Sequence, residues 1–463
     1  MSTQSGVAEA ASGRMAAADR SVDRAYRYWR VRILASTIVG YALFYFVRTN
    51  ISVPLKAMGD DLGYSKERLG IILTLGGVTY GISKFINGFL GDHANPRYFM
   101  AIGLLGCAGM NALFGASASL LFLASFWVLN NWAQGMGFPP CAKSMAHWFS
   151  PRERSSTFGI WHTSHMIGAA LVSVLTGYLV QHFGWRSCFY VPAAIAAAGA
   201  AFIVLFLRDT PESLGLPPVE VYRGEETAGQ VEAEARQQES YWRVVVQYVL
   251  TSPFMWLISF ANLLVYVLRY VQLSWGPTFL QEAKGMSVVA SGWLSFGSEM
   301  GGMLGALLAG VLADRVFGSR AGRVCVLAML LMSGVIYAFW ITPAGHLVVA
   351  GTLFVLMGFL LYVPQMLIAA MAMNLGTKRA AAAAVGLTGI VGYASTILTG
   401  WGVGRIADRY GWGGAFGLML GCTLATVVLM AFTWNLGAHP HLDPAATDAE
   451  SAASLRTPPT AGT

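Results

Sequence analysis

Charged residues and cysteines are scarce in this sequence. Asp, Glu, Lys and Arg make up only 11% of the 463 residues, and 55% are hydrophobic. A soluble protein carries about 25% charged residues, so the composition excludes an ordinary soluble domain. The five cysteines are scattered and form no CxxC pair, which predicts small apolar packing groups and argues against a metal or redox motif.

Patterns typical of enzymes and of nucleic-acid-binding proteins are absent as well. The sequence contains nothing that resembles a catalytic triad, a metal-ligand cluster or a phosphate-cradling loop. We therefore expect no enzymatic activity, no cofactor and no metal. The formal net charge is +7, but basic and aromatic residues do not alternate outside the apolar runs as they do on a nucleic-acid surface, so nucleic acid is not expected as a partner.

Long apolar runs fill most of the chain. About 20 apolar residues are needed for a helix to cross a bilayer. Within a helix, the backbone N–H and C=O groups form hydrogen bonds with one another, so none is left unpaired in the lipid. The runs predict an all-α membrane protein with twelve spans. These are residues 30–54, 67–91, 98–116, 118–148, 156–181, 187–207, 249–280, 289–313, 323–342, 346–374, 381–404 and 412–435.

Lysine and arginine are unevenly distributed between the two sets of loops. With the N-terminus inside, the N-terminal tail and the short cytoplasmic loops hold fifteen of them and the opposite loops hold seven. The positive-inside rule then places both termini in the cytoplasm, with the protein crossing the inner (plasma) membrane many times. No short apolar region with a small-residue cleavage site precedes the first span, so we expect no removed signal peptide.

Polar stretches divide the chain into halves. Residues 208–248 are the longest polar interruption and predict a cytoplasmic linker between two six-helix halves, 30–207 and 249–436. Residues 1–29 form a cytoplasmic N-terminal segment. Residues 437–463 are rich in Ala, Pro, Thr and Ser and predict a disordered cytoplasmic tail.

Two arginines stand inside otherwise uncharged spans. Arg48 follows fifteen uncharged residues (33–47), and Arg269 is the one charge between 244 and 281. A guanidinium stays protonated in proteins and costs about 2.5–3.5 kcal/mol at a bilayer centre on insertion scales. Each arginine is therefore a functional-site candidate.

The two arginines occupy equivalent places in the two halves. Tyr45 and Arg48 become Tyr266 and Arg269 when 221 is added to their numbers. Tyr41 precedes Tyr45 by four residues, and the spacing i, i+4, i+7 predicts that all three side chains share one helical face. We interpret the two polar stripes as two halves of one anion site.

Two further landmarks repeat at nearly the same offset. The motif GFLGD ends at Asp92 and GVLAD ends at Asp314, an offset of 222, while FGW at 183–185 and YGW at 410–412 differ by 227. Parallel six-helix repeats indicate an alternating-access transporter with its site between the halves. Asp92 and Asp314 are expected to act in gating, by capping helix ends or pairing with loop arginines.

Longer strings carry a family resemblance. They are GYALFYFVRTN (40–50), YGISKFINGFLGDHANPR (80–97), QGMGFPPCAKSMAHWFSPRER (134–154), RDTPESLGLPP (208–218) and YVLRY (266–270). From about residue 26 to 435 the sequence resembles the organophosphate:phosphate antiporter family of the major facilitator superfamily, and it leans toward the hexose-phosphate branch. That branch also contains a membrane sensor for external hexose phosphate that signals to a histidine kinase.

The resemblance implies a substrate and two ligands for it. In this family one arginine from the first span and one from the seventh bind the phosphoryl group, and the matching positions are Arg48 and Arg269. A guanidinium fork fits phosphate oxygens bidentately, which a lysine does not. The resemblance also implies that an organophosphate and inorganic phosphate compete for this site, giving exchange by a monomeric carrier.

Lys84 and Glu299 are the other charges that stand deep inside spans. Lys84 shares a helical face with Tyr80 and either adds positive field for the phosphate or pairs with a carboxylate or reaches the membrane interface. Glu299 either neutralises a nearby cation while the site is empty and releases it to substrate, or forms a fixed structural pair.

Aromatic residues complete the predicted substrate site. His165 matches a histidine that the family implicates in substrate binding, and an imidazole with a pKa near ~6.5 gains charge beside a phosphate; a structural donor is the alternative. Trp161 lies one turn before it. The tyrosines offer a hydroxyl to the ligand or a ring for packing, and they are Tyr41, Tyr45, Tyr80, Tyr266, Tyr362 and Tyr393.

Three functions remain open at this point. The first is a secondary transporter that exchanges an organophosphate, in particular a sugar phosphate, for inorganic phosphate. The second is a transporter-like sensor of hexose phosphate with a histidine kinase partner. The third is a proton-coupled drug or metabolite carrier. Glu299 could serve as its proton-carrying acid, but the two matched arginines argue against a neutral or cationic substrate.

Overall fold

The computed structural model describes the backbone of residues 2–223, 245–318, 320–375 and 377–435. Side chains are described for the same residues except 2–20, Asp92, 151–152, 154–155, Glu220, 247–248 and 377–382. The predicted tail and residues 224–244 of the predicted linker therefore lie outside the described residues.

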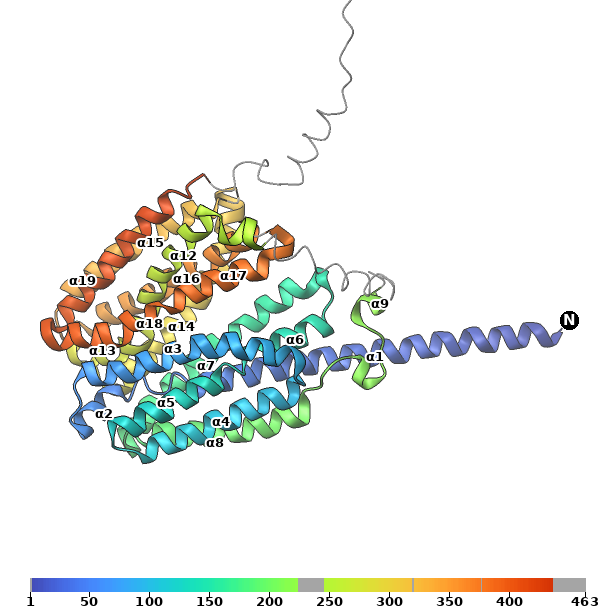
Figure 1. Ribbon diagram of the computed structural model, residues 1–463, viewed down its shortest axis with the longest axis horizontal. Coiled ribbons are helices and arrows are strands. Elements are labelled where there is room, and N and C mark those ends of the chain that lie inside the picture. Colours follow the sequence, from blue (N-terminus) through green and yellow to red (C-terminus); the bar gives the residue numbers. More distant parts are fainter. Residues whose placement is uncertain (1, 224–244, 319, 376, 436–463) are drawn as a thin grey trace, which may run out of the picture.

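The first half of the chain is a bundle of helices that covers the first six predicted spans (Figure 1). Its helices are α1 (Ser2–Phe46), α2 (Leu55–Leu62), α3 (Lys66–His93), α4 (Pro96–Ala116), α5 (Leu120–Gln134), α6 (Phe138–Trp148), α7 (Pro151–Phe183) and α8 (Ser187–Phe206). The short helices η1 (Glu212–Leu214) and α9 (Val219–Arg223) follow.

The second half repeats this arrangement and covers the last six spans. Its helices are η3 (Val246–Leu250), α12 (Pro253–Tyr270), η4 (Val271–Trp275), α13 (Gly276–Lys284), α14 (Val288–Val311), η5 (Leu312–Val316), α15 (Ala321–Ile341), α16 (Leu347–Leu375), α17 (Thr377–Tyr393), α18 (Ser395–Ile397), η6 (Leu398–Gly402) and α19 (Val403–Ala431). The short segments η3, η4, η5 and η6 are π-helical turns.

The predicted all-α architecture of two six-helix halves is confirmed. Nine uninterrupted helical stretches of the described residues are long and apolar enough to cross a membrane. Three predicted spans are missing from that set for local reasons. The fourth span is split between α5 and α6, and residues 383–431 hold two spans in one stretch. In the first span, α1 ends at Phe46, so only residues 33–46 are both helical and uncharged.

Local sequence signals explain where the helices begin and end. The fourth span breaks at Gly137-Phe-Pro-Pro140 because α6 starts with prolines, which lack the amide needed by a continuing helix. Ser150 and Glu153 form a capping box that starts α7. In α19, Gly411 has φ 68°, and this left-handed residue separates the end of the eleventh span from the twelfth.

The helix boundaries add a repeat that the motifs do not show. Gly63 ends α2 with φ 67°, and Gly285 ends α13 with φ 71°. Two residues later, the side chains of Ser65 and Ser287 cap α3 and α14. Both pairs differ by 222 positions, so the two halves share turn chemistry as well as helix order.

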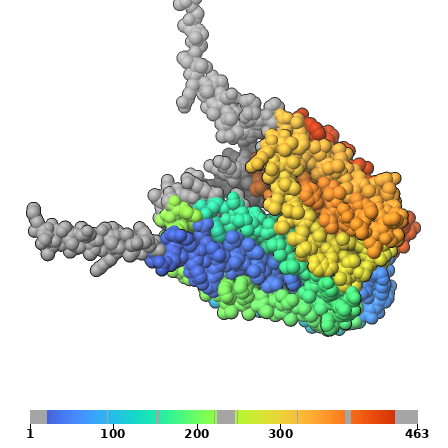
Figure 2. Space-filling view, turned by 180° about the vertical axis from the view of Figure 1, so that it is seen from behind, coloured from blue at the N-terminus to red at the C-terminus, as the bar shows by residue number. Residues whose placement is uncertain are grey.

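The two halves meet at the end of the molecule that carries α2 and α13, here called the closed end (Figure 1). Toward the opposite end, which carries α9 and the start of α1 and is here called the terminal end, the ribbons diverge. Viewed from behind, the yellow surface around α14 lies against the green surface around α7 (Figure 2).

Glycines allow the backbones of the two halves to touch at the closed end. A Cβ built on Gly70 of α3 would lie 2.4 Å from the carbonyl oxygen of Gly400 in η6. A Cβ on Gly292 of α14 would lie 2.5 Å from the carbonyl oxygen of Ser173 in α7. Small residues permit this approach between membrane helices, and any larger side chain would separate the halves.

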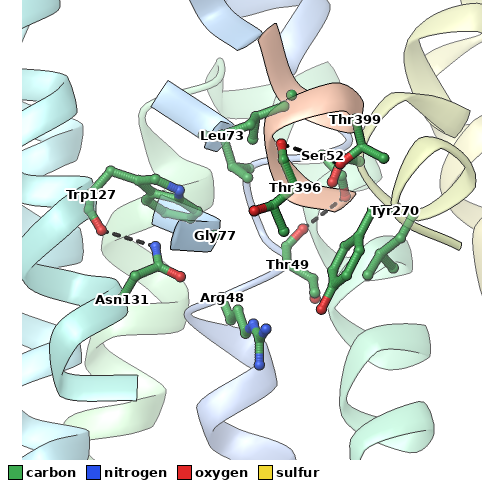
Figure 3. A pocket seen from close by; sticks show the side chains of 14 residues that line it. Arg48, Thr49, Ser52, Leu73, Gly77, Trp127, Asn131, Tyr270, Thr396 and Thr399 are labelled. Atoms are coloured by element: carbon green, nitrogen blue, oxygen red, sulfur yellow. Dashed lines mark hydrogen bonds between the residues drawn. The ribbon is translucent and has the colours of Figure 1, made fainter. Parts of the chain in front are cut away.

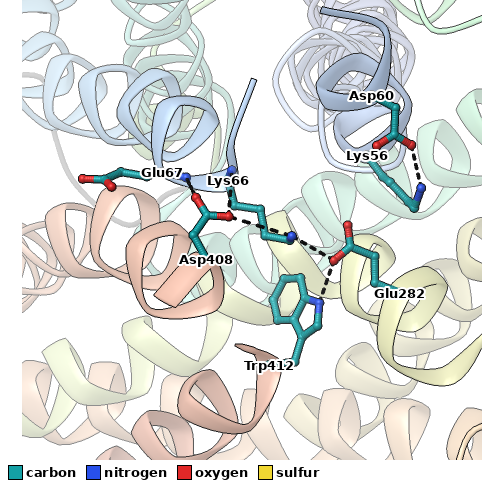
Figure 4. Close-up of polar contacts among 7 residues, drawn as sticks. All are labelled: Lys56, Asp60, Lys66, Glu67, Glu282, Asp408 and Trp412. Atoms are coloured by element: carbon teal, nitrogen blue, oxygen red, sulfur yellow. Dashed lines mark hydrogen bonds and ion pairs between the residues drawn. The ribbon is translucent and has the colours of Figure 1, made fainter. Parts of the chain in front are cut away.

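Polar contacts reinforce the same end (Figure 4). Lys66 at the start of α3 pairs with Glu282 across the interface at 3.1 Å, and Trp412 donates to the same carboxylate at 2.9 Å. The carboxylate of Asp408 accepts the backbone amides of Lys66 (3.3 Å) and Glu67 (2.7 Å). A residue of the second half thus caps a helix of the first half.

An asparagine network fixes the turn that follows α1. Asn111 donates to the carbonyl oxygen of Val47 at 3.0 Å, and Asn130 does the same at 3.0 Å. Asn50 donates to the side-chain oxygen of Asn111 at 2.8 Å. All three asparagines are buried, so the turn carrying the next residue, Arg48, is held by buried amide donors.

Replacing Gly70 with valine should favour states in which the closed end is open. Overpacking typically costs about 1–3 kcal/mol, so the open population should rise about 5- to 150-fold. The measurement is the rate at which an impermeant maleimide, applied from the closed end, labels a cysteine introduced at Ser52. Gly109→Val is the matched control because a Cβ there meets nothing within 4 Å. Equal labelling in both variants would contradict the close-packing argument.

Replacing Asn111 with alanine should destabilise the first half and weaken ligand binding. Each buried partner left unpaired costs about 1–3 kcal/mol, and Asn111 serves several partners. Asn87→Ala provides the comparison, because the Asn87 amide is equally buried but donates once, to Ser83 at 2.8 Å. Thermal unfolding and ligand affinity should both suffer more in Asn111→Ala; an equal or smaller effect would show that the network does not position the turn.

Candidate functional site

Arg48 lies in the turn after α1 and not on the helix. The helix ends at Phe46, and the amides of Arg48 and Thr49 both donate to the carbonyl of Tyr45, at 3.2 and 3.0 Å. The prediction that Tyr41, Tyr45 and Arg48 share one continuous helical face was therefore wrong at its last position. The turn still brings the Arg48 guanidinium to 5.3 Å from the centre of the Tyr45 ring.

Two aromatic rings face the Arg48 guanidinium. Its central carbon lies 3.6 Å from the centre of the Tyr80 ring, closer than it lies to Tyr45. A guanidinium over an aromatic face gains attraction without losing its N–H donors to a carboxylate. The residue is half-buried, so its charge is held at the edge of the cavity and remains available to an anion.

Arg269 occupies the equivalent place in the second half, in the last turn of α12. The π-helical segment η4 begins two residues later, and such segments often mark functional sites. The Arg269 residue is only 8% exposed, and its guanidinium lies 4.9 Å from the centre of the Tyr362 ring. Both arginines are thus stacked on tyrosines.

Glu299 does not form the ion pair that was expected for it. Its carboxylate accepts a hydrogen bond from the Tyr362 hydroxyl at 2.6 Å, and the ion pairs of the described residues do not include it. Glu299 is 7% exposed. The ring of Tyr362 faces Arg269 while its hydroxyl holds Glu299, so one tyrosine connects the cation with the carboxylate.

Lys84 reaches the same region from α3. Its ammonium lies 4.8 Å from the ring centre of Phe138 and 5.5 Å from that of Tyr393. Among the ion pairs of the described residues, none involves Lys84, Arg48 or Arg269. The predicted alternative of a Lys84–carboxylate pair is therefore not seen, and three cations face one region.

Tyr393 joins the two halves at the level of the cations. Its ring centre lies 5.3 Å from that of Tyr80 in the first half and 5.7 Å from that of Tyr266 in the second. Tyr270 also lies 6.3 Å from it. The sequence analysis did not select Tyr270, although it directly follows Arg269 in the YVLRY string.

The remaining aromatic candidates form a wall in the first half. Tyr41 packs on Trp161 with ring centres 4.7 Å apart, and the Trp161 indole nitrogen donates to the carbonyl of Thr37 at 3.4 Å. His165 lies 5.3 Å from the Tyr45 ring and 4.6 Å from the His162 ring. Tyr41, Trp161 and His165 are buried, so this wall supports Tyr45 behind Arg48.

Two neighbouring hollows extend from the arginines toward the closed end. The first is lined by Arg48 and by polar side chains of both halves (Figure 3); the lining residues that the figure labels are Arg48, Thr49, Ser52, Leu73, Gly77, Trp127, Asn131, Tyr270, Thr396 and Thr399. The second contains Arg269, Gln272, Ser298, Glu299 and Tyr362. Leu273 borders both hollows.

The hydroxyl and amide groups around Arg48 had no signal in the sequence analysis. Thr396 and Thr399 come from the uncharged eleventh span, and Asn131 donates to the carbonyl of Trp127 at 2.9 Å. Neutral polar residues of this kind are common in membrane helices, where they hydrogen-bond to their own backbone. Only their position beside Arg48 distinguishes them.

Of the two predicted gating aspartates, only Asp314 has a described side chain, and it lines neither hollow. Asp314 lies in η5 at the end of α14 and is exposed. The side chain of Asp92 lies outside the described residues. Their predicted role in gating therefore stays a prediction.

Comparisons with known proteins agree with this architecture. The family model of the Major Facilitator Superfamily matches residues 37–400. A solved bacterial homolog to the human lysosomal transporter Spinster, in an inward-facing and unoccupied conformation, has a TM-score of 0.67 and 17% sequence identity, covering 88% of this chain and 95% of that chain. At this identity the likeness concerns the fold alone.

Curated relatives are much more similar in sequence. A probable hexose phosphate transport protein from Chlamydia trachomatis is 39% identical, covering 89% of this chain and 93% of the relative. The glycerol-3-phosphate transporter of Bacillus subtilis is 38% identical (90% and 95%). The membrane sensor protein UhpC of Escherichia coli is 35% identical (89% and 94%).

The family model covers well over half of the chain, and these relatives match almost all of it. Two of these relatives are transport proteins and the third is a membrane sensor, and none of them is an enzyme. The chain therefore belongs to the major facilitator superfamily and, within it, to the organophosphate:phosphate antiporter family.

Proposed function

We propose that the protein is a secondary transporter that exchanges an organophosphate, specifically a hexose or other sugar phosphate, for inorganic phosphate. The observation that carries this proposal is a set of three cations between the halves. Arg48 and Arg269 line two neighbouring hollows, and Lys84 faces Tyr393, whose ring contacts the Tyr80 ring on which Arg48 stacks. None of the three cations has a carboxylate ion-pair partner in the described residues. Such a site favours an anion of at least two charges, as a phosphate monoester or inorganic phosphate is near neutral pH.

The symmetry of the site supports alternating access. Arg48 belongs to the first half and Arg269 to the second, so a phosphoryl group held by both would connect the halves. Each guanidinium can offer a planar fork to two phosphate oxygens. Ligand binding then changes the relative free energy of two arrangements of the halves, which is the thermodynamic basis of exchange.

With the termini in the cytoplasm, as the loop charges predict, the closed end faces outward and the structure corresponds to an inward-facing state. The glycine contacts and the Lys66–Glu282 pair then form the outer gate. Exposed ion pairs contribute little each, so ligand binding can supply enough free energy to open this gate.

Tyr362 keeps Glu299 from pairing with Arg269 in the empty site, so Arg269 stays available to the ligand. Its hydroxyl holds Glu299 at 2.6 Å while its ring stacks on Arg269 at 4.9 Å. The carboxylate therefore lowers the net charge of the empty cavity without forming an ion pair with Arg269. We expect the ligand's phosphoryl group to bind Arg269 directly, with Glu299 remaining on Tyr362.

A sensor function is the second candidate, because the membrane sensor UhpC is 35% identical over 89% of this chain. In that case the same site binds a hexose phosphate, and the change in arrangement is passed to a histidine kinase partner. Helix α1 extends from the membrane-spanning region back to Ser2 and offers a surface for such a contact.

Exchange of radiolabelled phosphate in proteoliposomes separates these functions. A transporter should take up labelled external phosphate into proteoliposomes loaded with hexose 6-phosphate, and it should release the label again when unlabelled phosphate is added outside. Ligand binding without any exchange would contradict the transporter and leave the sensor. Exchange of neutral or cationic solutes, with none of phosphate, would contradict both.

Arg48→Lys and Arg269→Lys should each reduce phosphate exchange although the charge is kept. Losing a charge-assisted bidentate contact costs about 1.5–3 kcal/mol, or about 10- to 150-fold in rate. Arg323→Lys is the control, because Arg323 contacts Trp434 and Asn435 and lines neither hollow. Wild-type exchange in either cavity variant would refute the bidentate contact.

Tyr362→Phe should weaken phosphate binding by about 2- to 12-fold, the effect of one hydrogen bond of about 0.5–1.5 kcal/mol, because the released Glu299 can then compete for Arg269. The double variant Tyr362→Phe with Glu299→Gln should regain affinity, since the competing charge is gone. Affinity would be measured by competition with labelled phosphate. If the double variant binds more weakly than Tyr362→Phe alone, Glu299 has a different role.

A further inference from the structure

Three arginines gather at the terminal end of the first half, away from the cavity. Arg32 comes from α1, Arg97 from the first turn of α4, and Arg208 lies two residues beyond the end of α8. All three donate to the last backbone carbonyls of α8. The contacts are Arg32 to Leu205 (2.9 Å) and Phe206 (3.2 Å), Arg97 to Val204 (2.5 Å), and Arg208 to Leu205 (3.2 Å) and Leu207 (2.8 Å).

Backbone carbonyls accept hydrogen bonds from these arginines but do not neutralise their positive charge. None of the three arginines belongs to an ion pair of the described residues. The carboxylate of Asp209, the residue after Arg208, accepts instead from the side chain of Asn95 at 3.2 Å. Burial, and then the positive charges of Arg97 and Arg32, lower the pKa of Arg208.

Aromatic rings frame the three arginines. Arg32 lies over Trp29 at 5.0 Å and over Phe206 at 4.4 Å, and Arg208 lies over Trp29 at 5.4 Å. Tyr28 and Tyr98 stand beside the group with 55% and 51% of their surface exposed. Tryptophan and tyrosine beside arginine are typical of the level where a membrane protein meets lipid headgroups.

An apolar surface continues from this group along the membrane-spanning helices. Leu205 at the end of α8 is 59% exposed, and Ile102 and Leu105 of α4 are 61% and 50% exposed. Helices α4 and α8 lie side by side on the outer surface of the first half (Figure 1). This surface suits acyl chains, whereas a water-soluble phosphate ester has nothing to place on it.

We propose that Arg32, Arg97 and Arg208 bind the phosphate headgroup of an anionic phospholipid whose acyl chains lie along α4 and α8. Guanidinium groups pair with phosphate oxygens through charge-assisted hydrogen bonds, and basic groups between helix ends recognise such headgroups. The Nη groups of Arg97 and the Nη2 group of Arg208 make no hydrogen bond within the described residues, so donors are available.

The bound lipid would stabilise the start of the linker. Arg208 begins the segment that leads to α9, and the carbonyl of Asp209 accepts from the Trp148 indole at 2.9 Å. Tyr222 of α9 in turn stacks on Tyr26 of α1 with ring centres 3.9 Å apart. A headgroup at the arginines therefore sits where α1, α4, α8 and the linker converge.

The test is a lipid titration of the purified protein in neutral detergent, followed by the apparent unfolding temperature. Dioleoylphosphatidylglycerol should raise this temperature saturably, and dioleoylphosphatidylcholine should not. Arg97→Gln and Arg208→Gln should each weaken the apparent phosphatidylglycerol affinity about 10-fold or more, as expected for a hydrogen bond to a charged group. Arg323→Gln, which removes another arginine stacked on a tryptophan, should titrate like the unmodified protein.

Tyr28→Glu keeps the proposal falsifiable if an arginine variant fails to fold. It retains all three arginines and the residues whose carbonyls they contact, but it replaces the hydroxyl that accepts from Arg32 Nη1 with a carboxylate, four residues before Arg32 on an exposed helix face. It should also lose the phosphatidylglycerol effect. Equal stabilisation by both lipids, or an unchanged titration in Tyr28→Glu, would overturn the proposal.

The same experiment distinguishes a lipid headgroup from a water-soluble phosphate ester as the ligand of these arginines. Soluble glycerol 1-phosphate at millimolar concentration should stabilise Arg97→Gln as much as the unmodified protein, because it has no site at these arginines. If Arg97→Gln abolishes stabilisation by glycerol 1-phosphate, the group binds a water-soluble phosphate and the lipid assignment is wrong.

Discussion

Positive charge without a paired carboxylate is the constraint on which the site depends. Arg48, Lys84 and Arg269 each face an aromatic ring in place of an acid. Aromatic faces attract cations weakly compared with carboxylates, so the charges are stabilised enough to remain in the membrane-spanning region but are not neutralised. Under the proposed function, an arriving phosphoryl group would meet three donors that need not first break an ion pair.

The same constraint explains why the site lies between the halves. Either half alone would offer only one of the two guanidinium forks, and binding one phosphoryl group between both forks requires the two halves together. Tyr393 contacts Tyr80 and Lys84 of the first half and Tyr266 of its own half, so movement of the halves changes the surroundings of every cation. At the closed end, the contact between the halves depends on the close approach of the backbones at Gly70 and Gly400. Rotation of the halves would separate these backbones.

The sequence predicts the architecture because apolar run length and repeat offset are local properties. It also identifies Arg48 and Arg269, since a charge in an uncharged span stands out. It does not predict that α1 ends before Arg48, because the turn there depends on asparagines from other helices. The partner of Glu299 was predicted as a cation and is a tyrosine 63 residues away; periodicity carries no information about such contacts.

The central claim is that one phosphoryl group contacts both arginines, and a structure with a heavy tetrahedral oxyanion tests it most directly. Crystals soaked in or grown with arsenate should show anomalous density within hydrogen-bond distance of the guanidinium groups of Arg48 and Arg269 together. Arsenate bound at one arginine alone, or elsewhere in the cavity with both guanidinium groups still stacked on Tyr80 and Tyr362, would contradict the account.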